Sequence, residues 1–139
     1  VTNEYFYAEE NNGAFCNETR IKVNSKKSFE FCSLAISNSE MNILKSYNFF
    51  NKKHVKKIGS IAYKIALVAK GTIDLAISLT KKNDWDLAAA DLLIREARGK
   101  IMETNGKKII YNTQNLNINS VMAANANIIS NLKKKFDCL

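Results

Sequence analysis

The chain has 139 residues, of which 46% are hydrophobic and 24% are charged. This is enough for one domain with a core, and it excludes a disordered, collagen-like or disulfide-dense chain. The 21 Lys and Arg residues exceed the 13 Asp and Glu residues, which gives a net charge of +8. Arg-rich patches with interleaved aromatic residues are missing, so nucleic acid is not the expected partner. The charge is typical of a solvated basic surface or of a protein that attracts small anionic substrates.

The first third of the sequence favours strands. Aromatic residues within 2–8 and at 14–15 flank the Asn-Asn-Gly sequence at 11–13, which predicts a β-hairpin. Residues 20–23 alternate polar and apolar side chains and predict a short edge strand. Residues 31–36 form an apolar run of the length expected for a buried strand.

A helix is predicted over residues 41–50. Ser37 and Glu40 precede it at the spacing of a capping box, in which each side chain bonds the other residue's backbone N–H. A second helix is predicted over 60–70, because apolar residues recur there at helical spacing and Gly71 follows as a stop.

The remaining chain alternates strands and helices, which indicates an α/β domain. Alternation predicts a strand over 73–77, and helical spacing predicts a helix from 87 that ends at Gly99 and a last helix over 128–136. Three further apolar runs predict strands: 101–102, 109–111 and 121–124.

Cysteine and histidine do not predict a metal site. Cys16, Cys32, Cys138 and His54 lack the close spacing that a zinc site needs. The odd cysteine count predicts reduced thiols and a cytoplasmic location. No stretch reaches the roughly 18 apolar residues of a membrane span, and the first ten residues lack signal-peptide character, so no membrane partner is expected. His54 lies in the basic run 51–57, which we interpret as a solvated surface.

The segment 84–91, with the sequence Asp-Trp-Asp-Leu-Ala-Ala-Ala-Asp, is the most informative part of the chain. Asp84 and Asp86 lie at the start of a predicted helix, where a carboxylate can accept N–H bonds, so one of them could simply be the N-cap. The functional alternative is a magnesium ligand, because Mg²⁺ takes one or two carboxylates and leaves other positions to water and phosphate.

Three segments carry a resemblance to a known family. Residues 59–64 read Gly-Ser-Ile-Ala-Tyr-Lys, residues 67–74 read Leu-Val-Ala-Lys-Gly-Thr-Ile-Asp, and residues 85–90 read Trp-Asp-Leu-Ala-Ala-Ala. They resemble the C-terminal half of the inositol monophosphatase family, whose pattern is G-[ST]-A-A, VA-x-G-x-x-D and WD-x-A-A, followed by EAGG. The resemblance implies the C-terminal half of that family's layered α-β-α-β-α fold, a mixed sheet flanked by helices. It implies a strand-rich segment over 1–58 and an α/β domain over 59–139.

The resemblance also implies site residues. The aspartate of the family's WD motif binds catalytic Mg²⁺, and Asp86 stands at that position. The Gly-Ser turn lies against the substrate in the family, which points to three residues here: Gly59, Ser60 and Ile61.

Relatives that act on 3′(2′),5′-bisphosphate nucleotides can use a lysine after this turn for the second phosphate. Lys64 is the candidate, and Lys81 and Lys82 are further possibilities. An exposed helix lysine is the alternative for Lys64, and the usual position of lysine at protein surfaces favours it. The family's inositol-contacting glutamate falls near Ser78, so that contact is not carried over.

One family motif is missing. Relatives carry a glutamate and an Asp-Pro-Ile/Leu-Asp-Gly-Thr motif that supply most metal ligands, and no D-x-x-D-G-[ST] occurs here. The chain also begins at Val1 rather than Met, so we expect a C-terminal part of a longer protein that alone binds metal weakly and turns over little.

Three functions follow from these observations. The first is Mg²⁺-dependent hydrolysis of a phosphate monoester such as an inositol phosphate, by a cytoplasmic enzyme that is often a homodimer in the family. The second is hydrolysis of adenosine bisphosphates. The third is a non-catalytic basic module that binds anions. The coding sequence upstream of Val1 distinguishes the enzymes from the module, since an in-frame D-P-x-D-G-T indicates an enzyme.

Overall fold

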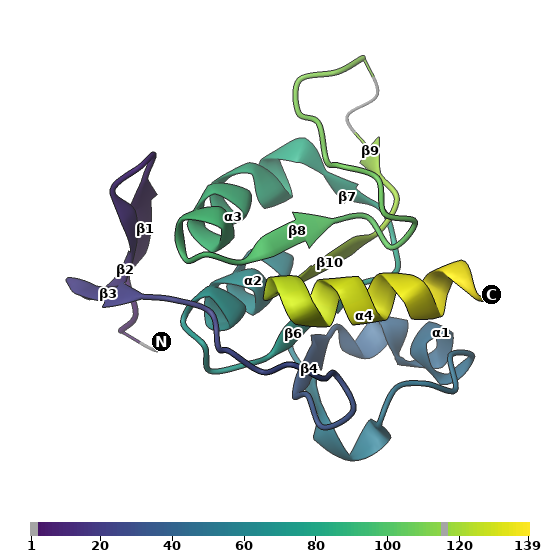
Figure 1. Cartoon of the computed structure of the whole chain (residues 1–139). Helices are drawn as coiled ribbons and strands as arrows, with labels where there is room; N and C mark the ends of the chain where they lie inside the picture. The colour runs from purple at the N-terminus through teal and green to yellow at the C-terminus, as the bar shows by residue number, and fades with distance from the viewer. Residues whose placement is uncertain (1–2, 115–116) are drawn as a thin grey trace.

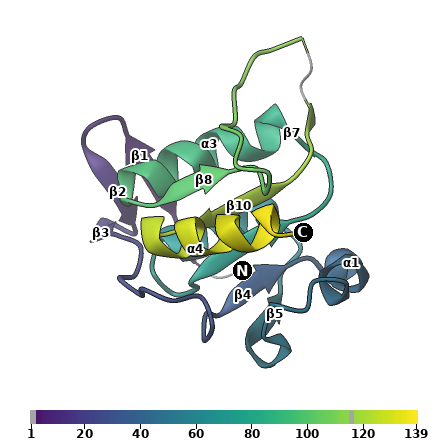
Figure 2. The ribbon, with the colours of Figure 1, turned by 45° about the vertical axis from the view of Figure 1, so that its right-hand side comes forward.

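The computed structural model describes residues 3–114 and 117–139, which are arranged in layers (Figure 1). The outer layer is a three-stranded antiparallel sheet in the order β1-β2-β3, built from β1 (Phe6–Glu9), β2 (Gly13–Cys16) and β3 (Thr19–Ile21). Two helices form the next layer: α2 (Ile61–Ala69) and α3 (Asp84–Glu96). A five-stranded sheet follows, and α4 (Ala126–Asp137) crosses its far face (Figure 2).

The five-stranded sheet is mixed, with the order β5-β4-β6-β10-β8. Its strands are β4 (Leu34–Ile36), β5 (Val55–Lys57), β6 (Leu75–Ser78), β8 (Lys100–Met102) and β10 (Val121–Ala124). β5, β4 and β6 run parallel, whereas β10 is antiparallel to both β6 and β8. Shorter elements complete the fold: the 3₁₀ turns η1 (Asn38–Glu40) and η2 (Lys52–His54), the helix α1 (Met41–Lys45), and the strand pair β7 (Lys82–Asn83) and β9 (Asn117–Ile118).

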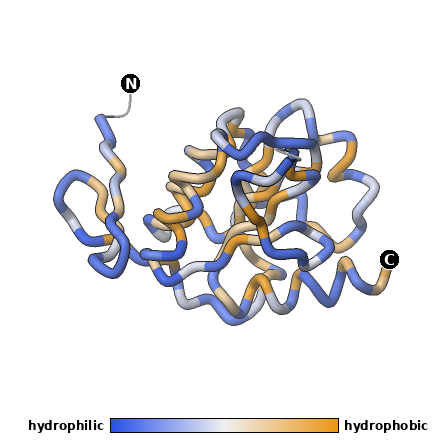
Figure 3. Tube along the Cα trace, turned by 90° about the horizontal axis from the view of Figure 1, so that it is seen from above, coloured by the Kyte–Doolittle hydropathy of each residue, from blue (hydrophilic) through white to orange (hydrophobic). Residues whose placement is uncertain are grey.

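The core lies on both faces of this sheet because helices cover both. Alternate strand residues point to opposite faces. Ala35, Ala76 and Ala123 face the α2–α3 layer, and these small side chains let the helices approach closely. Larger residues such as Ile36 and Ile77 pack against α4 and α1. Hydrophobic residues accordingly gather between the layers in Figure 3, and hydrophilic ones follow the outer turns.

Most predicted elements are confirmed. The hairpin forms around a turn in which Asn11 and Gly13 have φ of 66° and 95°; residue 2, where its predicted first arm began, lies outside the described residues. The predicted edge strand forms as β3, and both long helices, the last helix and three of the later strands form where expected. The domain boundary expected between residues 58 and 59 stays a prediction. β4 and β5 lie before it and pair within the same sheet as β6, which lies after it.

Four expectations fail in detail. The strand expected over 31–36 begins only at Leu34, and Phe31 is 73% exposed. The helix expected over 41–50 ends at Lys45. Residues 109–111 form an irregular segment rather than a strand. The basic run 51–57 is solvent-facing as predicted, but it contains the unpredicted edge strand β5.

Across residues 3–114 and 117–139, none of the helices has the length and apolar character needed to cross a membrane.

Candidate active site

Three parallel strands end at the same edge of the large sheet, and their outgoing loops meet there. β4 leads into residues 37–40, β5 into residues 58–60, and β6 into residues 79–81. The connections that leave β4 and β5 run to opposite faces, since α1 packs on the α4 side and α2 on the other. In open α/β sheets, ligands bind outside the carboxyl ends of strands at such a point.

A cleft of about 440 Å³ opens at this edge between the first turns of α2 and α3. Its lining residues come from these two turns and the strand before α3: Gly59, Ser60, Ile61, Ala62, Lys82, Trp85 and Asp86. Helix N-termini carry partial positive charge and unpaired N–H groups, so they favour anions. The cleft therefore combines two anion-attracting helix ends, one lysine and one carboxylate.

The start of α2 is fixed by Ser60. Its Oγ accepts a hydrogen bond from the N–H of Tyr63 at 3.2 Å, which makes Ser60 the N-cap. A Cβ placed on Gly59 would meet no atom of the described chain within 4 Å. Packing within this chain thus gives no reason for glycine there, and the open space lets a ligand approach the backbone.

The start of α3 separates the two aspartates. The N-cap itself is Asn83, so neither aspartate is the N-cap, but Asp86 stands at the third position of the helix and completes a capping box with Asn83. Asp86 lines the cleft, and its Oδ2 accepts a hydrogen bond from the backbone N–H of Asn83 at 3.0 Å. Asp84 is buried and accepts from the N–H of Asn112 at 2.8 Å. Asp86 is therefore the carboxylate available to a ligand in the cleft.

Asp86 can supply one ligand to a divalent cation. Within the part of the chain that the structure describes, no cluster of three or more His, Cys, Asp or Glu side chains could hold a metal ion. Mg²⁺ is commonly held by one or two carboxylates, with water and substrate phosphate in its other positions. The donor chemistry of the cleft fits one protein ligand to Mg²⁺ and requires the others from elsewhere.

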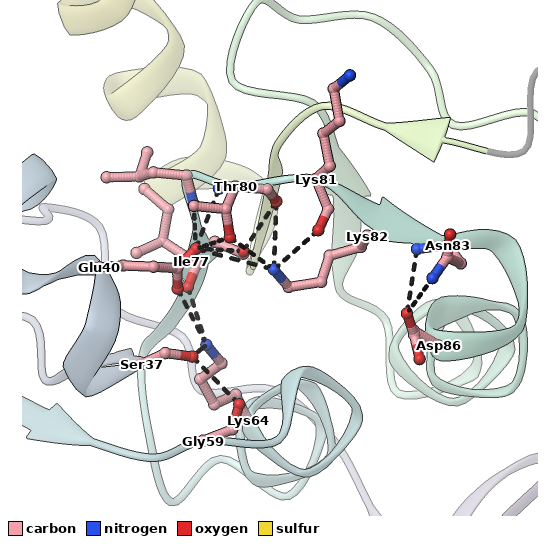
Figure 4. A network of polar contacts seen from close by, with 12 residues as sticks. Ser37, Glu40, Gly59, Lys64, Ile77, Thr80, Lys81, Lys82, Asn83 and Asp86 are labelled. Atoms are coloured by element: carbon pink, nitrogen blue, oxygen red, sulfur yellow. Dashed lines mark hydrogen bonds and ion pairs between the residues drawn. The ribbon is translucent and has the colours of Figure 1, made fainter.

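Lys64 does not lie on the surface, so the surface interpretation is wrong. Its side chain is 0% exposed, and its Nζ donates to Ser37 Oγ at 3.0 Å and to the carbonyl of Ile77 at 3.3 Å (Figure 4). It also faces Glu40, with 3.8 Å between Nζ and Oε2. Lys64 is absent from the lining of the cleft, and its contact with a second phosphate stays a prediction.

Glu40 and Lys64 both remain charged at neutral pH. Burial alone would raise the pKa of Glu40, but hydrogen bonds from Ser78, Thr80 and Leu79 and the charge of Lys64 outweigh it and lower that pKa to about 2. Burial lowers the pKa of Lys64 to about 8, although the charge of Glu40 opposes the shift.

Lys82 and Lys81 lie differently. Lys81 is exposed, whereas the stem of Lys82 lines the cleft and only 17% of its side chain is exposed. The Lys82 ammonium donates to the carbonyl and hydroxyl of Thr80, at 3.2 and 2.8 Å, and lies 3.9 Å from Glu40 Oε1. Glu40 thus stands between two lysines, so this corner of the site keeps a net positive charge.

The capping box expected for Ser37 and Glu40 does not form. Neither side chain caps η1 or α1; Ser37 Oγ instead donates to the carbonyl of Gly59. Glu40 bonds residues 78–80. Their roles were missed because these partners lie 22 to 40 residues away in sequence, where spacing carries no signal.

Of four other hollows in the described part of the chain, none sets a carboxylate beside a helix N-terminus, and two of them illustrate this. One of about 570 Å³ lies between β1 and the helices α2 and α3 and is lined largely by apolar and tyrosine side chains. One of about 360 Å³ contains Asp91, but this carboxylate already bonds Arg95 and Tyr111. The cleft between the helix starts is therefore the candidate site.

Comparison with known proteins supports the resemblance found in the sequence, both in the family and in the half of its fold that is matched. The sequence model of the inositol monophosphatase family matches residues 1–136. A fructose-1,6-bisphosphatase/inositol-1-monophosphatase of Thermotoga maritima is 33% identical over 109 residues, which are 76% of this chain and 42% of that protein. The 3′(2′),5′-bisphosphate nucleotidase CysQ of Haemophilus influenzae is 34% identical over 62 residues, or 45% of this chain and 23% of that protein.

Solved structures agree with this match. An inositol monophosphatase structure from Thermotoga maritima superposes with a TM-score of 0.79 and 27% identity, covering 97% of this chain and 52% of that one. The chain aligns with the C-terminal half of such structures. This chain spans about half the length of that solved structure and a smaller share of the two curated proteins.

Proposed function

The chain belongs to the inositol monophosphatase family, and on this premise we propose that it supplies the C-terminal part of a Mg²⁺-dependent enzyme that hydrolyses phosphate monoesters. The family consists of metal-dependent phosphatases. The observation that carries the proposal is the cleft itself, where Asp86, in the first turn of α3, lines the same hollow as the N-terminal turn of α2. A cation ligand beside two anion-attracting helix ends is the arrangement that a metal-bound phosphate ester needs.

Four of the lining residues have a role in this proposal. Asp86 Oδ2 is held by the N–H of Asn83, and the carboxylate would be one ligand to the ion. Ile61 and Ala62 line the cleft in the first turn of α2, where backbone N–H groups have no partner within the helix and would bind phosphate oxygens. Gly59 leaves room for the ester to approach the backbone.

A bound Mg²⁺ would polarise the phosphoryl oxygens and lower the pKa of a coordinated water. Because Asp86 is one ligand of several, the 139 residues alone should bind the ion weakly and show little turnover.

The test removes the charge of Asp86. Asp86→Asn, made in the protein that includes the coding region upstream of Val1, should lower Mg²⁺-dependent release of phosphate from inositol 1-phosphate by roughly a hundredfold or more. Loss of outer-shell partners alone costs about 10–100-fold in metal affinity or activity. Asp137→Asn, at an exposed carboxylate on α4, is the matched control and should leave the rate unchanged. Equal rates for Asp86→Asn and wild type would overturn the proposal, as would strong activity of residues 1–139 alone.

A nucleoside bisphosphate is the second candidate substrate. Ser78, near the position of the family's inositol-contacting glutamate, is fully buried and donates to Glu40, so it offers nothing to an inositol hydroxyl. Lys82 adds a cation beside the cleft. A preference for 3′-phosphoadenosine 5′-phosphate over inositol 1-phosphate that disappears in Lys82→Met, but persists in the exposed Lys81→Met, supports this substrate. If wild type, Lys82→Met and Lys81→Met show the same preference between the two substrates, Lys82 does not bind the second phosphate.

A further inference from the structure

Glu40 is a buried carboxylate whose hydrogen bonds all go to one loop. The residue is 1% exposed. Its Oε1 accepts four hydrogen bonds from residues 78–80: from Ser78 Oγ at 2.6 Å, Leu79 N at 2.9 Å, Thr80 N at 3.0 Å and Thr80 Oγ1 at 2.7 Å. A short chain of three residues thus wraps around a single oxygen atom.

The second oxygen of Glu40 faces Lys64. Among the residues with described positions, none gives Oε2 a hydrogen bond, and the Lys64 ammonium lies 3.8 Å away. Lys64 is fully buried and is held in turn by Ser37 and the carbonyl of Ile77. The carboxylate therefore has a counter-charge on α2 and a hydrogen-bonded partner in the loop after β6.

This pair connects the carboxyl ends of the parallel strands. Glu40 follows β4, and Lys64 belongs to the helix that follows β5. The loop whose hydrogen bonds Glu40 accepts follows β6. The same loop continues through β7 to Asn83, whose backbone N–H donates to Asp86. Figure 4 shows Lys64 and Lys82 reaching toward Glu40 from two sides, with Asn83 and Asp86 at the other end of the loop.

Stability alone is a poor explanation for such a pair. Removing two charges from water is costly, and buried ion pairs are often no more stabilising than apolar residues of the same size. The four hydrogen bonds that residues 78–80 donate to one carboxylate oxygen do, however, fix the geometry of that segment closely.

We propose that Glu40 is a positioning residue of the cleft, which holds the loop 79–83 so that Asp86 is presented to a divalent cation. The proposal rests on the function proposed above for Asp86. Lys64 keeps the Glu40 carboxylate in place, and Lys82 is carried to the cleft by the same loop.

The experiment replaces the pair by apolar residues and measures metal binding directly. The double variant Glu40→Leu/Lys64→Met removes both charges of the pair, so neither partner is left as an unpaired buried charge; Lys82 keeps its hydrogen bonds to Thr80, and the fold should persist. Mn²⁺ alone is the probe, and line broadening of the amide resonances of residues 84–88 measures its affinity. The variant should bind Mn²⁺ about tenfold more weakly, the size of effect typical for partners that orient a metal ligand.

The matched control is Asp91→Leu/Arg95→Met, which removes an ion pair within α3, together with the hydrogen bond that Tyr111 donates to Asp91, and does not touch the loop. It should leave Mn²⁺ affinity unchanged. Amide exchange supplies a second measurement: the N–H groups of Leu79, Thr80 and Asn83 should lose protection in the Glu40 variant, while those of β6 and β10 keep it. Unchanged Mn²⁺ affinity in the folded Glu40 variant would overturn the proposal.

Thr80→Val covers the case in which the double variant does not fold. It removes the hydroxyl that donates to Glu40 and accepts from Lys82, at a residue that is exposed as a whole. It should also weaken Mn²⁺ binding, and wild-type affinity would contradict the proposal. If wild type itself shows no broadening near Asp86, the function proposed for Asp86 fails. Hydrogen exchange of the Asn83 amide then tests the role of Glu40 separately. Equal protection of this amide in wild type and in the Glu40 variant would show that Glu40 does not hold the loop.

Discussion

Two buried charges near the cleft, Glu40 and Lys64, depend on each other and on pH. The carboxylate is ionised at any pH well above about 2, and the ammonium is protonated below about 8. Between these limits the two charges face each other, and a change in either leaves the partner buried without compensation.

Glu40→Gln should lower the free energy of unfolding by about 3 kcal/mol at pH 7, because buried Lys64 loses its counter-charge and must either stay unpaired or give up its proton. The pKa of Glu40 is depressed in the folded protein from its ordinary value of 4.5 to about 2. The stability it contributes is therefore complete above pH 4.5 and is lost as the pH falls toward 2. Urea unfolding of both proteins between pH 2 and 7 should show the difference shrinking below pH 4.5. Glu30→Gln, the same change at an exposed site, should stay within about 0.5 kcal/mol of wild type; a pH-independent difference for Glu40→Gln would contradict the assignment.

The burial of Lys64 shows where reasoning from single residues stops. Lysine is mostly exposed in proteins, and the sequence around it is that of an ordinary amphipathic helix. Lys64 can be buried because its ammonium faces a carboxylate 24 residues earlier and donates to a carbonyl on β6. Neither partner can be identified before the strands are in register. The helix start that carries Asp86 is local by contrast, because the N–H that holds its carboxylate belongs to Asn83; the metal-binding role of Asp86 was inferred from the motif at 85–90 and stays a prediction.

At the level of elements, the C-terminus of α3 has one residue in an unfavourable conformation. Arg98 has a φ of 65°, and its N–H donates to the carbonyl of Arg95 while that of Gly99 donates to Ile94. This is the Schellman arrangement, whose left-handed residue is usually glycine. The related family pattern EAGG has glycine at this position.

Arg98→Gly should therefore raise the free energy of unfolding by about 0.5–1 kcal/mol. Relief of the left-handed cost of about 1–2 kcal/mol is partly offset by the greater freedom of glycine in the unfolded chain. Thermal unfolding measures it, and Arg98→Ala, which keeps the Cβ, should give no gain. A gain of the same size in both variants would show that the arginine side chain, rather than its backbone, is responsible.

Elements with a clear period were predictable, and those defined by distant partners were not. Regular apolar spacing located α2, α3 and α4, and β10 was found in full because it is a buried apolar run. Residues 109–111 are equally apolar, yet Tyr111 donates its hydroxyl to Asp91 and Ile110 is 65% exposed, so the segment lies along α3 instead of joining a sheet. β5 was missed because its lysines face solvent at a sheet edge.

At the scale of the whole molecule, polar contacts join the hairpin sheet to the helices, and Glu96 is central among them. Its two oxygens accept from the backbone N–H groups of Asn11 and Gly13 at 3.0 and 2.9 Å. Lys70 adds an ion pair with Glu4 at 2.6 Å. The turn of the hairpin is thus held by one carboxylate at the end of α3.

Glu96→Ala should loosen this layer without unfolding the large sheet. Two backbone donors lose a charged acceptor, which should cost about 1–3 kcal/mol. Because the loss falls on the turn, amide exchange should accelerate most over β1 and β2 and little over β6 and β10. Glu10→Ala, at an exposed residue of the same hairpin, is the control and should change neither stability nor exchange. Uniform acceleration over all strands would mean that the hairpin sheet and the large sheet unfold as one unit and that Glu96 does not act on the turn alone.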